Sequence, residues 1–154
     1  MNIYFICTGN TCRSPMAEAI LKSKNIEGIE VRSAGIYAME GRAMSQNANA
    51  VLNRENIKHN HKSSIFNAQD AAWADLILTM TAAHKDQVLR LSEEAHGKTY
   101  TLNEYAMPQK GVDIQDPYGG DLYVYQQTFD QLNEAIHNLE KKLEMEAFTL
   151  YLQI

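Results

Sequence analysis

The stretch Ile3-Tyr4-Phe5-Ile6-Cys7-Thr8-Gly9-Asn10-Thr11-Cys12-Arg13-Ser14 decides how this chain folds. Its beginning, from Asn2 to Ile6, is a short run of aromatic and branched residues, which predicts a buried strand. Cys7 follows where that strand should end. Ser14 and Pro15 then open an amphipathic stretch, with Ser14 as the expected N-cap and Pro15 at the first helical position. The sequence therefore predicts a strand, a loop and a helix N-terminus in direct succession.

Such a loop is suited to hold an anion. Backbone N–H groups at a helix N-terminus can converge on one point, and the helix dipole adds a partial positive charge there. Gly9 and Asn10 allow backbone conformations that other residues avoid. The expected phosphate-binding loop consists of Thr8, Gly9, Asn10, Thr11, Cys12, Arg13 and Ser14.

One thiol and one guanidinium flank this loop. The helix dipole, the N–H donors and a fixed cation would all favour the thiolate form of Cys7, which is the nucleophilic form. The planar fork of Arg13 can donate two parallel hydrogen bonds to two oxygens of a phosphoryl group. The loop lacks the Gly-Lys-Ser/Thr ending of a nucleotide-binding loop.

The pattern Cys7-x5-Arg13-Ser14 after a first strand resembles the low-molecular-weight protein tyrosine phosphatase family. The resemblance extends to Ser33-Ala34-Gly35, to residues 74–80 and to Asp116-Pro117, so it covers nearly the whole chain. It implies a cysteine-dependent protein phosphatase in which Cys7 forms a cysteinyl-phosphate. It also implies that Arg13 binds the phosphoryl group.

The resemblance further identifies Asp116 as the general acid. The leaving group must receive a proton when the sulfur attacks phosphorus, and a carboxylic acid opposite the nucleophile would supply it. Asp113 is the weaker candidate because it lacks the following proline. Ser14 has two compatible roles, capping the helix and donating a hydrogen bond to the Cys7 sulfur.

Cys12 is not needed for phosphoryl transfer, and a small buried residue is its simplest interpretation. Its position five residues from Cys7 also allows a redox role. An oxidised Cys7 could be trapped as a Cys7–Cys12 disulfide, which would block further oxidation.

The substrate hypothesis rests on Thr11. The tyrosine phosphatases of the family typically carry Ile at this loop position, whereas members similar to the bacterial protein arginine phosphatases carry Thr. Thr makes the pocket roomier and more polar, and a single aromatic ring at Tyr118 can stack on a planar guanidinium. Met39 also lies where many tyrosine phosphatases have Trp. These positions favour phosphoarginine over phosphotyrosine, and phosphotyrosine remains the alternative.

Two other functions are disfavoured. An arsenate reductase needs further cysteines to relay a disulfide, and none follows Cys12. A phosphate-binding module without activity would not need the nucleophile, the arginine and the candidate acid together.

Composition agrees with a single domain spanning residues 1–154, with 45% hydrophobic and 21% charged residues. A net charge of −5 without a Lys/Arg stripe argues against nucleic acid as a partner. No cofactor is expected, and the two cysteines and scattered histidines, His59 and His61 included, predict no metal site. The first residues run directly into a strand, so we expect no membrane segment and a cytoplasmic monomer acting on phosphorylated proteins.

Alternating strands and helices predict an α/β fold, a doubly wound and mostly parallel sheet of four to five strands with helices on both faces. The expected strands cover residues 2–6, 29–34, 61–65, 75–79 and 99–102. The expected helices cover residues 16–23, 45–55, 68–73, 81–91 and 121–146, with loops at 36–44 and 105–120. The apolar tail, residues 147–154, should dock onto the domain or contact a partner.

Overall fold

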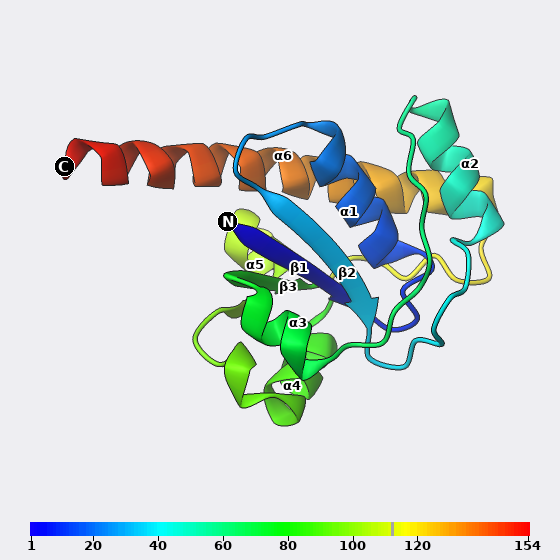
Figure 1. The fold of residues 1–154 in the computed structure, drawn as a ribbon. Coiled ribbons are helices and arrows are strands. Elements are labelled where there is room, and N and C mark those ends of the chain that lie inside the picture. The colour runs from blue at the N-terminus through cyan, green and yellow to red at the C-terminus, as the bar shows by residue number, and fades with distance from the viewer. Residues whose placement is uncertain (112) are drawn as a thin grey trace.

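The computed structural model describes residues 1–111 and 113–154, and within them the chain forms a four-stranded parallel sheet in the order β2-β1-β3-β4 (Figure 1). The strands are β1 (Asn2–Cys7), β2 (Glu30–Gly35), β3 (Leu76–Thr79) and β4 (Thr99–Thr101). Strand β1 lies in the centre, where Cys7 pairs with Gly35 of β2. The predicted doubly wound sheet is therefore confirmed, and its carboxyl edge carries the loop that follows β1.

Helices cover both faces of the sheet (Figure 1). Helices α1 and α6 lie on one face, and α3 and α4 lie on the other. The helices are α1 (Arg13–Ser23), α2 (Gln46–Arg54), α3 (Ala68–Trp73), α4 (Ala82–Leu91), the short 3₁₀ turn η1 (Glu93–Ala95), α5 (Leu102–Ala106) and α6 (Leu122–Leu152).

The alternation of side chains along β1 divides the core in two. Ile3 and Phe5 face the larger cluster, which includes the buried stripes of α1 and α6. Tyr4 and Ile6 face the smaller cluster against α3 and α4. Because successive residues of a strand point to opposite faces, a strand that is apolar throughout must be buried on both sides. This burial fixes the position of Cys7 at the end of the strand.

The predicted strand at residues 61–65 is wrong. Within the described residues this segment is a loop with one isolated bridge, between Ile65 and Gly35. Its backbone bonds instead to the loop after β2, with Ser63 donating to the Arg42 carbonyl. The side chain of His61 and the backbone N–H of Ser64 turn to Asn10, which an extended sheet strand would not allow.

The start of α1 also differs from the prediction. The helix begins at Arg13, and the Cys12 carbonyl accepts the N–H of Met16. Ser14 therefore lies in the first turn and is not the N-cap, and Pro15 is not the first helical residue. The Ser14 hydroxyl is used in the loop instead. The predicted loop at 105–120 is likewise shortened, since α5 continues to Ala106.

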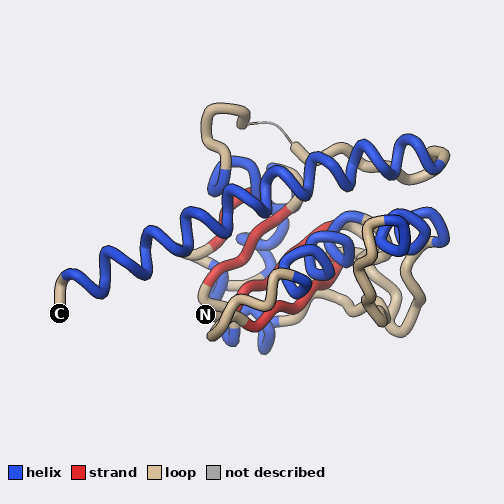
Figure 2. Tube along the Cα trace, turned by 90° about the horizontal axis from the view of Figure 1, so that it is seen from above, coloured by secondary structure: helices blue, strands red, loops and turns tan. Residues whose placement is uncertain are grey.

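The tail does not dock onto the domain. Helix α6 continues beyond the predicted end to Leu152, and residues 144–154 are all exposed. Figure 2 shows this end of α6 projecting past the sheet. Among the residues that the structure describes, α6 included, no helix combines the length and apolar character needed to cross a bilayer.

Candidate active site

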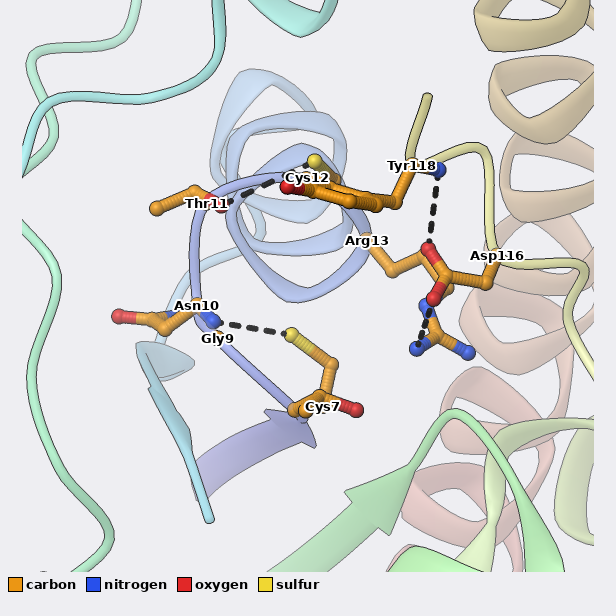
Figure 3. Close-up of a pocket in the computed structure, with 9 residues that line it drawn as sticks. Cys7, Gly9, Asn10, Thr11, Cys12, Arg13, Asp116 and Tyr118 are labelled. Carbon is orange, nitrogen blue, oxygen red and sulfur yellow. Dashed lines mark hydrogen bonds and ion pairs between the residues drawn. The ribbon is translucent and has the colours of Figure 1, made fainter. Parts of the chain in front are cut away.

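A pocket of about 280 Å³ opens where β1 gives way to α1 (Figure 3). It lies at the carboxyl edge of the sheet, the position where open α/β folds place their sites. Its lining residues are Cys7, Thr8, Gly9, Asn10, Thr11, Cys12, Arg13, Asp116 and Tyr118. The structure thus brings together the predicted nucleophile, loop, acid and specificity residues, except that Ser14 lies beneath the pocket and is buried.

The Cys7 sulfur faces hydrogen-bond donors. The backbone N–H of Asn10 donates to Cys7 Sγ over 3.3 Å, and Ser14 Oγ lies 2.8 Å from the same atom. Cys7 is 3% exposed, so most of the residue is shielded from water although it lines the pocket.

Asn10 holds the loop in shape. It is fully buried and adopts a left-handed backbone conformation with φ of 56°. Its side-chain nitrogen donates to Ser14 Oγ at 2.8 Å and to Ser33 Oγ at 2.9 Å, while its side-chain oxygen accepts the N–H of Ser64 at 2.9 Å. The His61 ring nitrogen Nε2 lies 2.7 Å from the Asn10 carbonyl. This conformation costs free energy for a residue with a side chain, and the network offsets that cost.

Gly35 explains why small residues end β2. A Cβ atom at this position would lie 2.4 Å from the Thr8 carbonyl oxygen and 2.8 Å from the Asn10 nitrogen. The backbone of residues 36 and 37 then donates to the Cys7 and Thr8 carbonyls. The end of β2 is therefore the surface against which the phosphate-binding loop is built, and only glycine fits there.

Arg13 and Asp116 form the opposite side of the pocket. Arg13 is 5% exposed and its NH1 donates to the Ile114 carbonyl at 3.2 Å, which fixes the guanidinium. Its NH2 lies 3.6 Å from Asp116 Oδ2, and that carboxylate is 55% exposed. The other oxygen of Asp116 accepts the Tyr118 N–H at 3.1 Å. The candidate acid is thus held by one cation and one backbone donor at the mouth of the pocket.

The two residues predicted to set substrate specificity, Thr11 and Tyr118, line the pocket. Thr11 is partly buried, and its carbonyl accepts the N–H of Ser45. Tyr118 is 84% exposed, so its ring is available to an incoming side chain (Figure 3). Met39 is exposed and absent from the pocket lining.

Cys12 is buried, as its simplest interpretation predicts, and it also contributes to the lining of the pocket. Its sulfur lies 3.3 Å from the Tyr125 hydroxyl and 3.4 Å from Ser45 Oγ. Burial, followed by the contact with Cys12, raises the pKa of Tyr125 to about 12. Both cysteines are free thiols in this structure.

His84 is a site residue that the sequence did not indicate. Its ring nitrogen Nε2 lies 2.8 Å from Thr8 Oγ1, and the side chain is buried. Burial, and then the nearby Arg13 guanidinium, lower the pKa of His84 to about 4. The ring therefore stays neutral and holds the first loop residue. A lone histidine on α4 gives no sequence signal for this contact.

Asp113 lies outside the pocket lining. Its side-chain oxygen accepts the backbone N–H of Ala82 at 2.9 Å, at the start of α4. This contact leaves Asp116 as the acidic side chain that lines the pocket.

Comparison with known proteins agrees with this geometry. A protein-arginine-phosphatase from Geobacillus stearothermophilus is 44% identical over 144 residues, covering 94% of this chain and 97% of the relative. The solved YwlE arginine phosphatase from Geobacillus stearothermophilus superposes with a TM-score of 0.93 at 42% identity, covering 96% of each chain.

A second solved structure is a mutant of the YwlE arginine phosphatase with a phosphorylated active-site serine. It superposes with a TM-score of 0.89 at 41% identity and covers 94% of this chain and 96% of the other. The family model for low molecular weight phosphotyrosine protein phosphatases matches residues 2–148. The chain belongs to the low molecular weight phosphotyrosine protein phosphatase family.

Proposed function

We propose that this protein is a protein arginine phosphatase, which removes phosphoryl groups from phosphoarginine in proteins through a cysteinyl-phosphate intermediate. The observation that carries the proposal is Thr11 at the rim of a pocket that holds Cys7, Arg13 and Asp116. The similarity to relatives named as arginine phosphatases supports it.

In the first step, Cys7 Sγ attacks phosphorus while the backbone N–H groups of the loop and the Arg13 guanidinium bind the phosphoryl oxygens. The P–N bond to the substrate guanidine breaks as the P–S bond forms. Asp116, at the pocket mouth opposite Cys7, gives its proton to the leaving nitrogen. Free arginine side chain leaves, and the phosphoryl group remains on sulfur.

In the second step, Asp116 takes a proton from water, and the resulting hydroxide oxygen attacks phosphorus. The P–S bond breaks, inorganic phosphate forms, and the electron pair returns to Cys7. The Asn10 N–H at 3.3 Å and the Ser14 hydroxyl at 2.8 Å stabilise the departing thiolate. The mutant relative with a phosphorylated active-site serine supports a covalent intermediate at this position.

Selection of phosphoarginine follows from the rim of the pocket. The Thr11 hydroxyl can accept an N–H of the guanidinium, whereas an Ile at that position would offer only apolar contact to a phenol ring. The exposed ring of Tyr118 can stack on the planar guanidinium. The Asp116 carboxyl group, in its protonated form, lies beside the same group and supplies the proton that the leaving nitrogen needs.

The alternative is a phosphotyrosine phosphatase, which the family description favours. The test is to compare kcat/KM on phosphoarginine and phosphotyrosine peptides for the wild type and for Thr11→Ile. We expect the wild type to prefer phosphoarginine, and Thr11→Ile to shift the ratio toward phosphotyrosine by about 1 to 3 kcal/mol in relative barrier. A wild type that prefers phosphotyrosine, with a ratio unchanged by Thr11→Ile, would assign the protein to the tyrosine phosphatases.

The site also bears on where the protein works. The reaction needs Cys7 in its reduced form, and a second free thiol, Cys12, lies in the same loop. Neighbouring thiols of this kind persist in reducing compartments. We therefore place the activity in the cytoplasm, with residues 1–154 acting as one domain on phosphorylated protein substrates.

A further inference from the structure

A second cluster of chemically active side chains lies behind the phosphate-binding loop. Glu18 of α1 meets His59 and His61 of the loop that follows α2. One ligand atom from each of the three residues lies within 4.8 Å of the other two. The three side chains are 9%, 7% and 5% exposed, so the cluster is well shielded from solvent. Two imidazoles and a carboxylate form one of the common ligand sets for zinc.

A buried ring nitrogen of His59 is the strongest indication that this cluster binds a ligand. Its Nε2 is buried and has no hydrogen-bond partner among the described residues. The atom lies 3.8 Å from Glu18 Oε1, which is too long for a hydrogen bond. A buried polar atom without a partner costs free energy. A cation between the imidazole and the carboxylate would satisfy both groups.

The hydrogen-bond partners of His61 and Glu18 match those of residues that bind metal ions in other proteins. His61 Nε2 lies 2.7 Å from the Asn10 carbonyl, so this nitrogen donates, and Nδ1 faces Glu18 Oε1 at 3.9 Å. Ser33 Oγ donates to Glu18 Oε1 at 2.6 Å, which orients the carboxylate. Ligating histidines almost always donate their second nitrogen to a carbonyl or carboxylate, and ligating carboxylates are themselves hydrogen-bonded.

We propose that Glu18, His59 and His61 form a binding site for a divalent transition metal of the zinc class. Imidazole ligands disfavour magnesium and calcium, which prefer oxygen alone. Tetrahedral zinc with bonds of about 2.0 to 2.1 Å sets its ligands about 3.3 Å apart. The separations of 3.8 and 3.9 Å must therefore shorten by roughly 0.5 Å, a change that side-chain rotation on a loop can supply.

The ion has a route of entry and one competitor. A surface cleft of about 370 Å³ reaches the cluster and is lined by Glu18, Ser33 and His61, among others. The ammonium group of Lys22 binds Glu18 Oε2 at 2.5 Å and must release that oxygen or share the carboxylate with the ion. Lys22 is 48% exposed, so water can take over its hydrogen bonds.

The site is connected to the phosphate-binding loop through a single residue. Metal binding at Nδ1 would make the Nε2–H of His61 a stronger donor to the Asn10 carbonyl. Asn10 in turn contacts Ser14 and Cys7. An ion at this site would therefore stiffen the loop from behind, without occupying the pocket in front.

The test is a direct binding measurement with Zn²⁺ alone. The full chain carrying Cys7→Ser and Cys12→Ser serves as the parent, since no thiol can then take the metal. Competition against a chromophoric chelator should show one Zn²⁺ per chain, and Co²⁺ should give the d–d absorption of a four-coordinate nitrogen and oxygen site. Added to the parent, His59→Asn and Glu18→Gln should each weaken binding at least tenfold.

Two further variants complete the design. His96→Asn removes an exposed histidine elsewhere and should leave the affinity within twofold of the parent. Lys22→Gln should tighten binding, because the competing cation is lost. Each variant's circular dichroism is compared with that of the parent, and His59→Asn, on a loop, carries the test should Glu18→Gln not fold. No stoichiometric binding by the parent up to 0.1 mM Zn²⁺ (on the order of the weakest specific sites), or equal affinity in His59→Asn, would overturn the proposal.

Discussion

The hydroxyl oxygen of Ser14 lies 2.8 Å from the sulfur of Cys7, and it accepts a hydrogen bond from the Asn10 side chain at the same distance of 2.8 Å. The Ser14 proton has two acceptors, the Cys7 sulfur at 2.8 Å and the Ala34 carbonyl at 3.4 Å, and the much shorter contact favours the sulfur. A thiolate that receives this proton donor is a weaker base and a better leaving group. The contact should therefore assist the second chemical step, in which the thiolate leaves, more than the first.

Removing this donor should change which step limits the rate. In Ser14→Ala we expect hydrolysis of the cysteinyl-phosphate to slow by about 10- to 150-fold, the effect of losing about 1.5 to 3 kcal/mol from a hydrogen bond to a charged atom. Rapid-quench kinetics should then show a burst of dephosphorylated product and accumulated phosphoenzyme. Ser23→Ala, at the far end of α1, is the matched control. A uniform loss of both steps would contradict the assignment.

Substitutions of the nucleophile and of the acid should have different effects on the reaction. Cys7→Ser should abolish turnover and still bind inorganic phosphate, because the loop N–H groups and Arg13 remain. Asp116→Asn should slow the first step by about 10² to 10⁴-fold, most strongly for substrates with poor leaving groups. Asp113→Asn is the control, since Asp113 bonds to Ala82 outside the pocket. Wild-type turnover by Cys7→Ser would exclude covalent catalysis.

Mild peroxide should inactivate the enzyme reversibly by forming a Cys7–Cys12 disulfide. Both thiols are free and both line the same pocket. A thiolate is oxidised first to sulfenic acid, which a neighbouring thiol condenses with. Peptide mapping after peroxide should find the two cysteines linked, and Cys12→Ser should become irreversibly inactivated instead. Recovery of Cys12 as a free thiol from the reversibly inactivated wild type would contradict the predicted disulfide.

Gly35→Ala should displace the phosphate-binding loop. A methyl group there would lie 2.4 Å from the Thr8 carbonyl oxygen. The contacting atoms belong to the backbone, which cannot move away without a large cost in free energy. We expect activity to fall at least tenfold, with a stability loss of about 1 to 3 kcal/mol. Gly41→Ala is the comparison, because its φ of 81° is strained for alanine but nothing lies within 4 Å of the new methyl. Equal effects of the two substitutions on activity would show that close packing of Gly35 is not what shapes the loop.

Stability should fall on mild acidification because of His84. Its pKa is lowered to about 4 in the folded protein, while the unfolded chain protonates near the ordinary value of 6.5. Between these values the unfolded state binds more protons, so folding stability decreases as the pH falls through that window, by about 1 to 3 kcal/mol.

Urea unfolding from pH 7.5 to 4.5 measures this slope. His84→Gln retains a side-chain N–H for Thr8 and cannot titrate, so its stability should depend less on pH than that of the wild type. His59, whose pKa burial also lowers, contributes in the same direction and remains in both proteins. Identical slopes in wild type and variant would mean that His84 is not held neutral.

Most of the fold was predictable because its signals are local. The apolar runs of β1 and β3 mark strands buried on both faces. Asn67, Thr81 and Asp121 each cap a helix that the sequence predicts to start within one residue of its observed beginning. The strand predicted at 61–65 failed because its pattern was short and polar. What decides its path is the distant Asn10, which binds that segment through Ser64 and His61.

The site residues divide in the same way, into those that local sequence predicts and those that only tertiary packing brings to the site. Cys7, Arg13 and the loop between them are contiguous in sequence, and the family resemblance supplied Asp116. His84 and Glu18 reach their partners only through the packing of α4 and α1. Neither their spacing in the sequence nor their residue type therefore predicts these contacts. Of the two roles predicted for Ser14, capping the helix is wrong, because the helix begins one residue before it, at Arg13, whereas the contact with the Cys7 sulfur is present at 2.8 Å.

The outer end of α6 has a thermodynamic consequence of its own. Beyond Glu146, which accepts a hydrogen bond from the Tyr105 hydroxyl at 3.2 Å, the residues are exposed to water, Phe148, Tyr151 and Ile154 among them. A helix that packs little against its domain is held mainly by propagation from a turn that is already formed, and short free helices are marginal in water. These turns should therefore open and close as a helix–coil equilibrium attached to a rigid domain. Their amides should exchange with solvent long before the cooperative unfolding that exposes the sheet.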